Sequence, residues 1–139
     1  MGLVYADITL VNYADTVLES IGQLKKKEIR RIVVSMLVDS GAYMMAINET
    51  IQAQLGLKTI DKRKAELSNG SVVEFDVVGP LKVLFKNRMA TANALVLPGN
   101  TEPILGAIPM EEMDVLIHPN RKELVVNPEH PIMAQLKMK

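Results

Sequence analysis

Cysteine and tryptophan are absent from this chain of 139 residues, and histidine occurs only twice. The lack of cysteine excludes disulfides, thiolate metal sites and cysteine nucleophiles. The histidines, His118 and His130, lie near proline turns, with neither helical ligand spacing nor a third ligand clustered beside them. This pattern argues against a metal site and favours surface positions. We therefore expect neither a metal nor another cofactor.

Net charge is absent as well, because 16 basic side chains balance 16 acidic ones. The chain as a whole therefore has no electrostatic attraction for nucleic acid or an anionic membrane. Its basic cluster, the lysines at 25–27 with Arg30 and Arg31, fits a solvated loop or strand edge. No apolar run is as long as a membrane span, and the first residues lack the pattern of a secretory signal. These absences predict a cytoplasmic protein with no nucleic-acid or membrane partner.

Strand patterns dominate what the sequence does contain. The length suits one domain over 1–139. Alternating or β-branched residues predict strands over 4–10, 29–38, 81–85, 90–97, 115–117 and 124–126. Residues 65–78 have the pattern of two hairpin arms, and Gly79-Pro80 breaks the second arm. Residues 12–28 are polar and poorly patterned, and they predict a surface excursion in the form of a long hairpin loop. Prolines in 127–139 predict an irregular tail.

One main short helix is expected among these strands. Apolar residues at 47, 51 and 55 repeat at helical spacing. Asn48 is a suitable N-cap, and Gly56 suits the left-handed conformation that commonly ends a helix. Residues 110–113 form a second, shorter helical candidate.

The tetrapeptide Asp39-Ser40-Gly41-Ala42 occurs once, directly after the apolar run Met36-Leu37-Val38. Gly41 permits a tight turn whose backbone N–H can reach the Asp39 carboxylate. Ser40 offers a hydroxyl that could form a hydrogen bond across the symmetry axis if two chains pair at this loop. Ala42 keeps the turn compact. The structural alternative is a turn that ends the strand, with Asp39 as its cap.

A carboxylate at the end of a rigid strand suits peptide hydrolysis by an activated water. Two carboxylates about 3 Å apart share one proton, so one can activate the water while the other polarises the scissile carbonyl. Because the motif occurs once, two chains would each have to contribute an Asp39. This interpretation requires a homodimer with one active site on its twofold axis.

Two further elements follow the tetrapeptide along the chain. Ser68-Asn69-Gly70-Ser71 centres on Asn-Gly, a strong signal for a two-residue hairpin turn. Ile104-Leu105-Gly106 is an apolar pair followed by glycine, just before the short helical candidate.

The order of these elements, from about Val4 to Val126, resembles the retropepsin-like (retroviral-type) aspartic proteases, and specifically their small bacterial or archaeal members. The resemblance implies an all-β, closed-barrel-like fold. It also implies that Asp39 is catalytic within the loop Asp39-Ser40-Gly41-Ala42, which Ile104-Leu105-Gly106 supports. The hairpin with its tip at Ser68-Asn69-Gly70-Ser71 would be the flap over the substrate.

Other groups are weaker candidates. A serine triad of Ser40 with His118 or His130 lacks the glycine-flanked turn that such a nucleophile needs. Asp114 could be an acidic site residue, but a cap or ion pair near the next strand is the simpler interpretation. Aliphatic candidates for pocket walls are Ile47, Val72, Ile104 and Ile108, and Met44 and Met45 could also line a pocket.

We therefore expect an aspartic endopeptidase that acts on a peptide or protein substrate as a homodimer through Asp39. The alternative is a catalytically silent module that keeps the fold and binds a peptide or protein. A third and weaker hypothesis is a small-molecule-binding β-barrel. Only a functional pair of Asp39 carboxylates separates the first hypothesis from the second.

Overall fold

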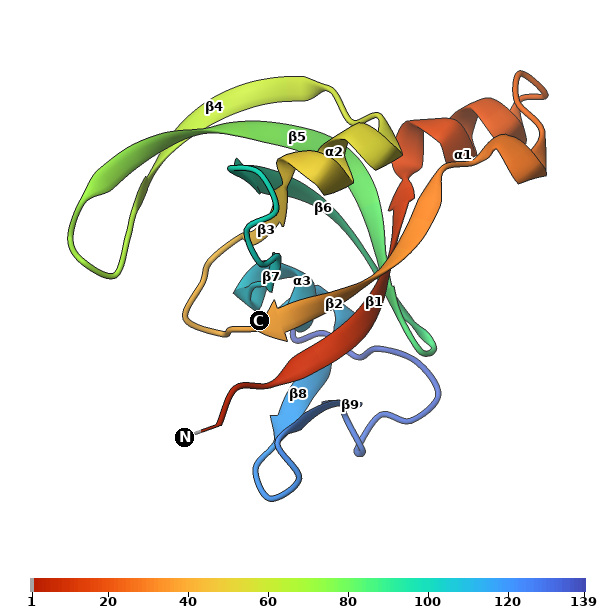
Figure 1. The fold of residues 1–139 in the computed structure, drawn as a ribbon. Helices are drawn as coiled ribbons and strands as arrows, with labels where there is room; N and C mark the ends of the chain where they lie inside the picture. The colour runs from red at the N-terminus through yellow and green to blue at the C-terminus, as the bar shows by residue number, and fades with distance from the viewer. Residues whose placement is uncertain (1) are drawn as a thin grey trace.

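The computed structural model describes residues 2–139 and consists mainly of strands, with three short α-helices (Figure 1). The helices are α1 (Tyr13–Ser20), α2 (Glu49–Leu55) and α3 (Ala107–Met113), and a 3₁₀ turn η1 covers Lys26–Glu28. The strands are β1 (Tyr5–Asn12), β2 (Arg31–Val38), β3 (Met45–Asn48), β4 (Thr59–Glu66), β5 (Val72–Phe85), β6 (Arg88–Leu97), β7 (Ile104–Leu105), β8 (Val115–His118) and β9 (Glu123–Val126).

Seven strands form one sheet in the order β1-β2-β7-β3-β6-β5-β4, and β8 pairs separately with β9. An additional pairing of β1 with β5 turns the large sheet into a ring of strands. Strand β4 pairs only with β5, so the β4–β5 hairpin extends beyond the ring as a long arm (Figure 1). The expected all-β architecture of retropepsin type is therefore present. No helix within residues 2–139 is long and apolar enough to cross a membrane.

Helix α2 forms where the sequence predicts it, because both of its ends are capped locally. The Asn48 side chain accepts a hydrogen bond from the Ile51 N–H at 2.9 Å. Gly56 ends the helix with φ of 61°, and the Leu57 N–H donates to the Gln52 carbonyl. Ile51 and Leu55 are buried in the main core. Capping signals and apolar spacing agree here, which explains why the prediction is correct.

The prediction of a long loop over 12–28 is wrong, because the segment contains α1 and η1. The Asn12 side chain accepts from the Asp15 N–H at 3.1 Å and caps α1. Asp15 is buried and forms an ion pair with Arg30, with 2.8 Å between Oδ2 and Nε. The side chains of Val17, Leu18 and Ile21 are exposed. The apolar pattern therefore gives no sign of burial, and capping and the ion pair hold the helix instead.

Strand β5 also differs from the prediction, since it continues through Gly79-Pro80 instead of ending there. The pairing of β5 with β6 shifts register between Val78 and Leu81, so the irregularity is accommodated as a bulge. Gly79 has φ of 144°, and a Cβ there would lie 2.6 Å from the Asn93 side-chain oxygen. The long strand links the projecting hairpin rigidly to the ring.

Candidate active site

The Asp39 loop begins where β2 leaves the sheet. The Asp39 N–H donates to the Leu105 carbonyl at 3.0 Å, and the Ala42 N–H donates back to the Asp39 carbonyl at 3.2 Å. The Gly41 N–H donates to Asp39 Oδ1 at 2.9 Å, as the sequence analysis anticipated. Asp39, Ser40 and Gly41 are all exposed. The turn therefore fixes a carboxylate in position while leaving it open to solvent.

Strand β7 holds this loop from the other side. Leu37 and Val38 of β2 pair in parallel with Ile104 and Leu105, and Ile104 also pairs with Ala46 of β3. Leu105 is fully buried in the core. The apolar pair thus lies between the strand that enters the Asp39 loop and the strand that leaves it.

Gly106 and the start of α3 complete the support. The Ala107 N–H donates to the Ala42 carbonyl at 2.7 Å, and the Ile108 N–H donates to the Tyr43 carbonyl at 3.1 Å. A Cβ at Gly106 would lie only 2.3 Å from the Met44 carbonyl oxygen, so no larger residue fits. The first N–H groups of a helix lack partners within the helix, and here the loop carbonyls satisfy them.

The β4–β5 hairpin turns at the Asn-Gly pair as predicted, but its loop has three residues, 68–70, instead of two. Gly70 has φ of 86°, and the Leu67 N–H donates to the Ser71 carbonyl at 2.8 Å. The Asn69 side-chain oxygen accepts from both the backbone N–H and the hydroxyl of Ser71. Residues 68–71 are all exposed. The tip is therefore an ordered turn with free space around it.

A groove of about 470 Å³ lies between this hairpin and the loop that follows Asp39. Its walls come from residues 41–44, residues 63–67 on the hairpin, and the apolar side chains of Phe75, Leu95, Leu97 and Ile104. Of the aliphatic wall candidates, Ile104 lines this groove and Ile108 lines an adjoining cavity. Ile47 is fully buried in the core, and Val72 is exposed on the hairpin arm, so neither is a wall of the groove.

Arg63, which the sequence pattern does not single out, lines both the groove and the adjoining cavity. Arginine on a strand is usually solvated, so its identity alone gave no signal. Arg63 pairs with Phe75 of β5, and side chains alternate between the two faces of a strand. This alternation is the feature that could have placed Arg63 on the face of β4 that lies toward the groove.

Asp39 and Ser40 also line a second cavity of about 480 Å³, on the side formed by residues 2–4 and Ile117. The chain therefore presents Asp39 at its surface, between this apolar cavity and the turn at Gly41.

Asp114 and His130 form a separate cluster, and His118 lies apart from them at the end of β8. His130 Nδ1 lies 2.6 Å from Asp114 Oδ2, and the buried Arg88 guanidinium lies 3.9 Å from the same oxygen. His118 Nδ1 accepts from the backbone N–H groups of Asn120 and Arg121. Within residues 2–139, neither histidine is hydrogen-bonded to Ser40, and no cluster of three potential ligands could hold a metal. The interpretation of Asp114 as an ion-pairing residue next to β8 is correct.

Asp114 holds the C-terminal tail against the rest of the fold through hydrogen bonds. Its pKa is lowered to about 2, first because the Gln135 N–H donates to its carboxylate, and then because the Asn127 amide and His130 do so. Asn87 adds two hydrogen bonds to the carbonyls of Pro131 and Ile132. A carboxylate with a lowered pKa stabilises the folded state above its ordinary pKa, and this contribution is lost as the pH falls toward the lowered value.

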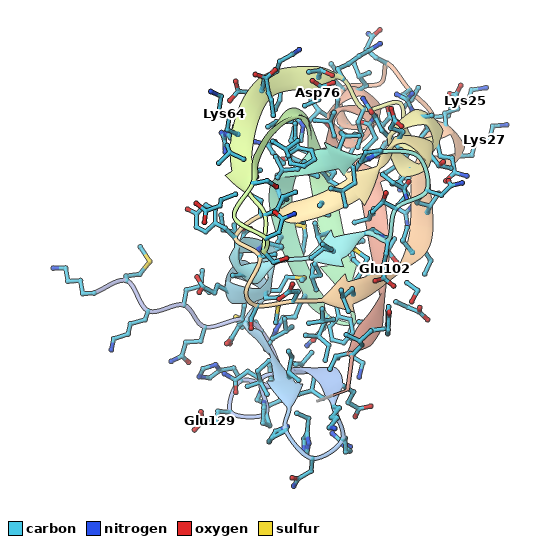
Figure 2. The ribbon with its side chains drawn as sticks, turned by 60° about the vertical axis from the view of Figure 1, so that its left-hand side comes forward. Lys25, Lys27, Lys64, Asp76, Glu102 and Glu129 are labelled. Atoms are coloured by element: carbon cyan, nitrogen blue, oxygen red, sulfur yellow. The ribbon has the colours of Figure 1, made fainter. Side chains whose placement is uncertain are left out.

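We expect Asp114→Asn to loosen the tail at neutral pH, because asparagine keeps the left-handed backbone at φ of 55° but removes the charge. The measurement is hydrogen-exchange protection of the Gln135 amide. Wild-type protection should fall below pH 3.8 and approach that of the variant near pH 2. Glu129→Gln, which removes an exposed charge from the same tail, is the control and should behave as wild type (Figure 2). Equal protection in Asp114→Asn and wild type at neutral pH would contradict this role.

Comparison with known proteins assigns the family. The family model described as aspartyl protease matches residues 27–116, which include the Asp39 loop, the hairpin and β7. The chain therefore belongs to the aspartyl protease family. No curated protein matches the sequence.

Among solved structures, the fold is similar to the retroviral protease-like domain of Ddi1 from Leishmania major, with a TM-score of 0.57 and 14% sequence identity. The match covers 92% of this chain and 90% of that one. Together with the family match, this likeness makes the chain a retropepsin-like member of the family, as the sequence analysis predicts.

Proposed function

We propose that the protein is an aspartic endopeptidase whose active site is completed by Asp39 from two subunits. The observation that carries the proposal is the exposed Asp39 carboxylate, held by the Gly41 N–H at 2.9 Å and supported from behind by β7 and α3. A catalytic carboxylate needs this combination of a fixed position and access to water. The support by Ile104, Leu105 and Gly106 gives the loop the rigidity that precise positioning requires.

The chemistry follows from pairing two such loops. Two carboxylates about 3 Å apart hold a single proton between them, because both cannot ionise cheaply. The ionised Asp39 removes a proton from a bound water as it attacks the scissile carbonyl carbon. The protonated Asp39 donates its proton to the carbonyl oxygen, which gives a tetrahedral diol. The C–N bond then breaks as the Asp39 that took the water proton gives it to the leaving amine, and the other Asp39 recovers its proton from a hydroxyl of the diol.

The groove supplies a place for an extended peptide substrate. It lies between the loop that follows Asp39 and the β4–β5 hairpin. The hairpin, with its tip at Ser68, Asn69, Gly70 and Ser71, is the flap in this proposal. An extended peptide can pair its backbone with neighbouring strands, while its side chains enter pockets on alternate sides. We infer that the hairpin covers the substrate and excludes water from the reacting bond.

A non-catalytic peptide-binding module is the second candidate. It is favoured by the fact that a single chain forms the whole groove of about 470 Å³. Such a module would bind peptide as a monomer and would not need Asp39. The two functions therefore differ in how they depend on protein concentration.

We expect peptidase activity to require the dimer. Below the dimer dissociation constant, the rate of cleavage of a fluorogenic peptide library should vary with the square of the protein concentration. Activity should peak at the pH where the carboxylate pair holds one proton and fall on both sides. Sedimentation over the same concentrations supplies the control, since the loss of specific activity and the loss of dimer should coincide. Peptide binding that is unchanged in the monomer, with no cleavage at any pH, would support the module instead.

A further inference from the structure

Arg63 occupies the junction between the groove and its neighbouring cavity. Its Nη1 lies 3.6 Å from the Met44 sulfur, so the side chain reaches from β4 to the loop that follows Asp39. The neighbouring cavity, about 210 Å³, is lined by Arg63, Met44, Thr91, Asn93 and Ile108. A peptide that runs along the groove would therefore pass directly beside this guanidinium.

The guanidinium is oriented but not neutralised at its outer end. Asp61 holds the inner edge of the side chain, with 3.3 Å between its Oδ2 and Arg63 Nε. The Nη1 end faces Met44, whose thioether is only a weak acceptor. Half of the Arg63 side chain is exposed, so a ligand can reach it. An arginine fixed along one edge keeps donors for the planar, bidentate recognition of a carboxylate.

The other charged side chains of the hairpin differ from Arg63 in their position. Lys62 lies within 4 Å of Glu74 and of Asp76, on the side of β4 opposite Arg63. Lys64 projects outward from the hairpin in Figure 2, and it also contributes to the groove wall. Glu66, the acid on the groove wall, is three residues from Arg63 along β4. Arg63 and Lys64 are the cations on that wall, and Arg63 is the one that also lines the adjoining cavity and reaches Met44.

We propose that Arg63 forms a binding subsite for a carboxylate side chain, so that preferred substrates carry Asp or Glu at the position beside it. This inference rests on the proposed peptidase function. A twofold-symmetric site contains two copies of Arg63, one for each half of the peptide. The preference for an acidic residue should therefore occur at one position on each side of the scissile bond.

The test compares matched peptides that carry Glu or Gln at the position that library profiling identifies. Wild type should cleave the Glu peptide with a kcat/KM about fivefold higher, chiefly through KM, and added salt should reduce the difference. Arg63→Gln should make the two peptides equal, and Arg63→Glu should reverse the preference in favour of Lys. Arg31→Gln is the matched control, because Arg31 is exposed at the start of β2, at the far end of the strand from Asp39.

The outcomes separate this inference from the proposed function. If wild type cleaves both peptides equally and Arg63→Glu changes nothing, the subsite is wrong while the peptidase remains. If wild type cleaves no peptide, the peptidase proposal fails, and titration of peptide pairs that carry Glu or Gln at each position in turn into the Asp39→Asn protein tests the subsite alone. Tighter binding of the Glu peptide, lost in Asp39→Asn combined with Arg63→Gln, supports the subsite, and equal binding overturns it.

Discussion

Asp39→Asn reduces kcat by a factor of about 10³ or more in the proposed mechanism, since a positioned general acid–base group contributes this much to a proton-transfer step. Asparagine has nearly the same shape and can still accept the hydrogen bond that the Gly41 N–H donates to Oδ1. It cannot remove a proton from water. The binding of peptide and the free energy of unfolding should therefore change little, because the carboxylate is exposed and outside the core.

Mixing wild-type and Asp39→Asn subunits tests whether two subunits share one active site. If each active site needs an Asp39 from both subunits, an exchanged equimolar mixture of wild type and Asp39→Asn retains about one quarter of the wild-type activity per total protein. Independent sites would retain about one half. A mixture that retains half of the activity, after subunit exchange has been verified by mass spectrometry, rejects the shared active site. Ser40→Ala in one partner is a useful comparison, since it alters the loop without removing the carboxylate.

Gly106→Ala is expected to cost about 3 kcal/mol of unfolding free energy, the upper end of the usual range for overpacking, because the fixed backbone around it cannot relax cheaply. The added Cβ would lie 2.3 Å from the Met44 carbonyl oxygen and 2.7 Å from the Ala42 carbonyl oxygen. Both carbonyls belong to the segment that β3 and α3 hold in place. Any shift that relieves the clash also moves the Asp39 loop, so activity should fall together with stability.

Urea denaturation measures this effect, and Gly2→Ala is the matched control. A Cβ at Gly2 would make only ordinary contacts, 3.7 Å from the Lys122 side chain. The control should therefore unfold at the wild-type midpoint. A Gly106→Ala protein with an unchanged midpoint would show that β7 and α3 do not clamp the loop as tightly as these distances indicate.

Local chemistry explains which parts of the fold could be predicted. Asn48 and Gly56 set the ends of α2, and Asn69-Gly70 sets the hairpin turn, through interactions within a few residues. The Asp39 turn is local in the same way, since Gly41 donates to the carboxylate two positions before it. Such features depend on backbone preferences and short hydrogen bonds, which the residue types themselves carry.

Elements that depend on distant partners could not be predicted. Helix α1 needs the ion pair between Asp15 and Arg30, which are fifteen positions apart, and its exposed face carries apolar residues. The continuation of β5 through Gly79-Pro80 depends on the bulge that its partner β6 accepts. In both places tertiary contacts override the local pattern.

The sequence alone determined the carboxylate, its turn and the order of the elements around it, because each depends on interactions between neighbouring residues. The tertiary structure decided which segments meet that turn. Pairing of β1 with β5 closes the ring, and β7 with the first N–H groups of α3 clamps the Asp39 loop from more than sixty positions away. Only this folding brings Arg63 beside Met44 at the edge of the groove. Contacts between distant segments depend on the packing of the whole chain, which no local pattern of residues specifies.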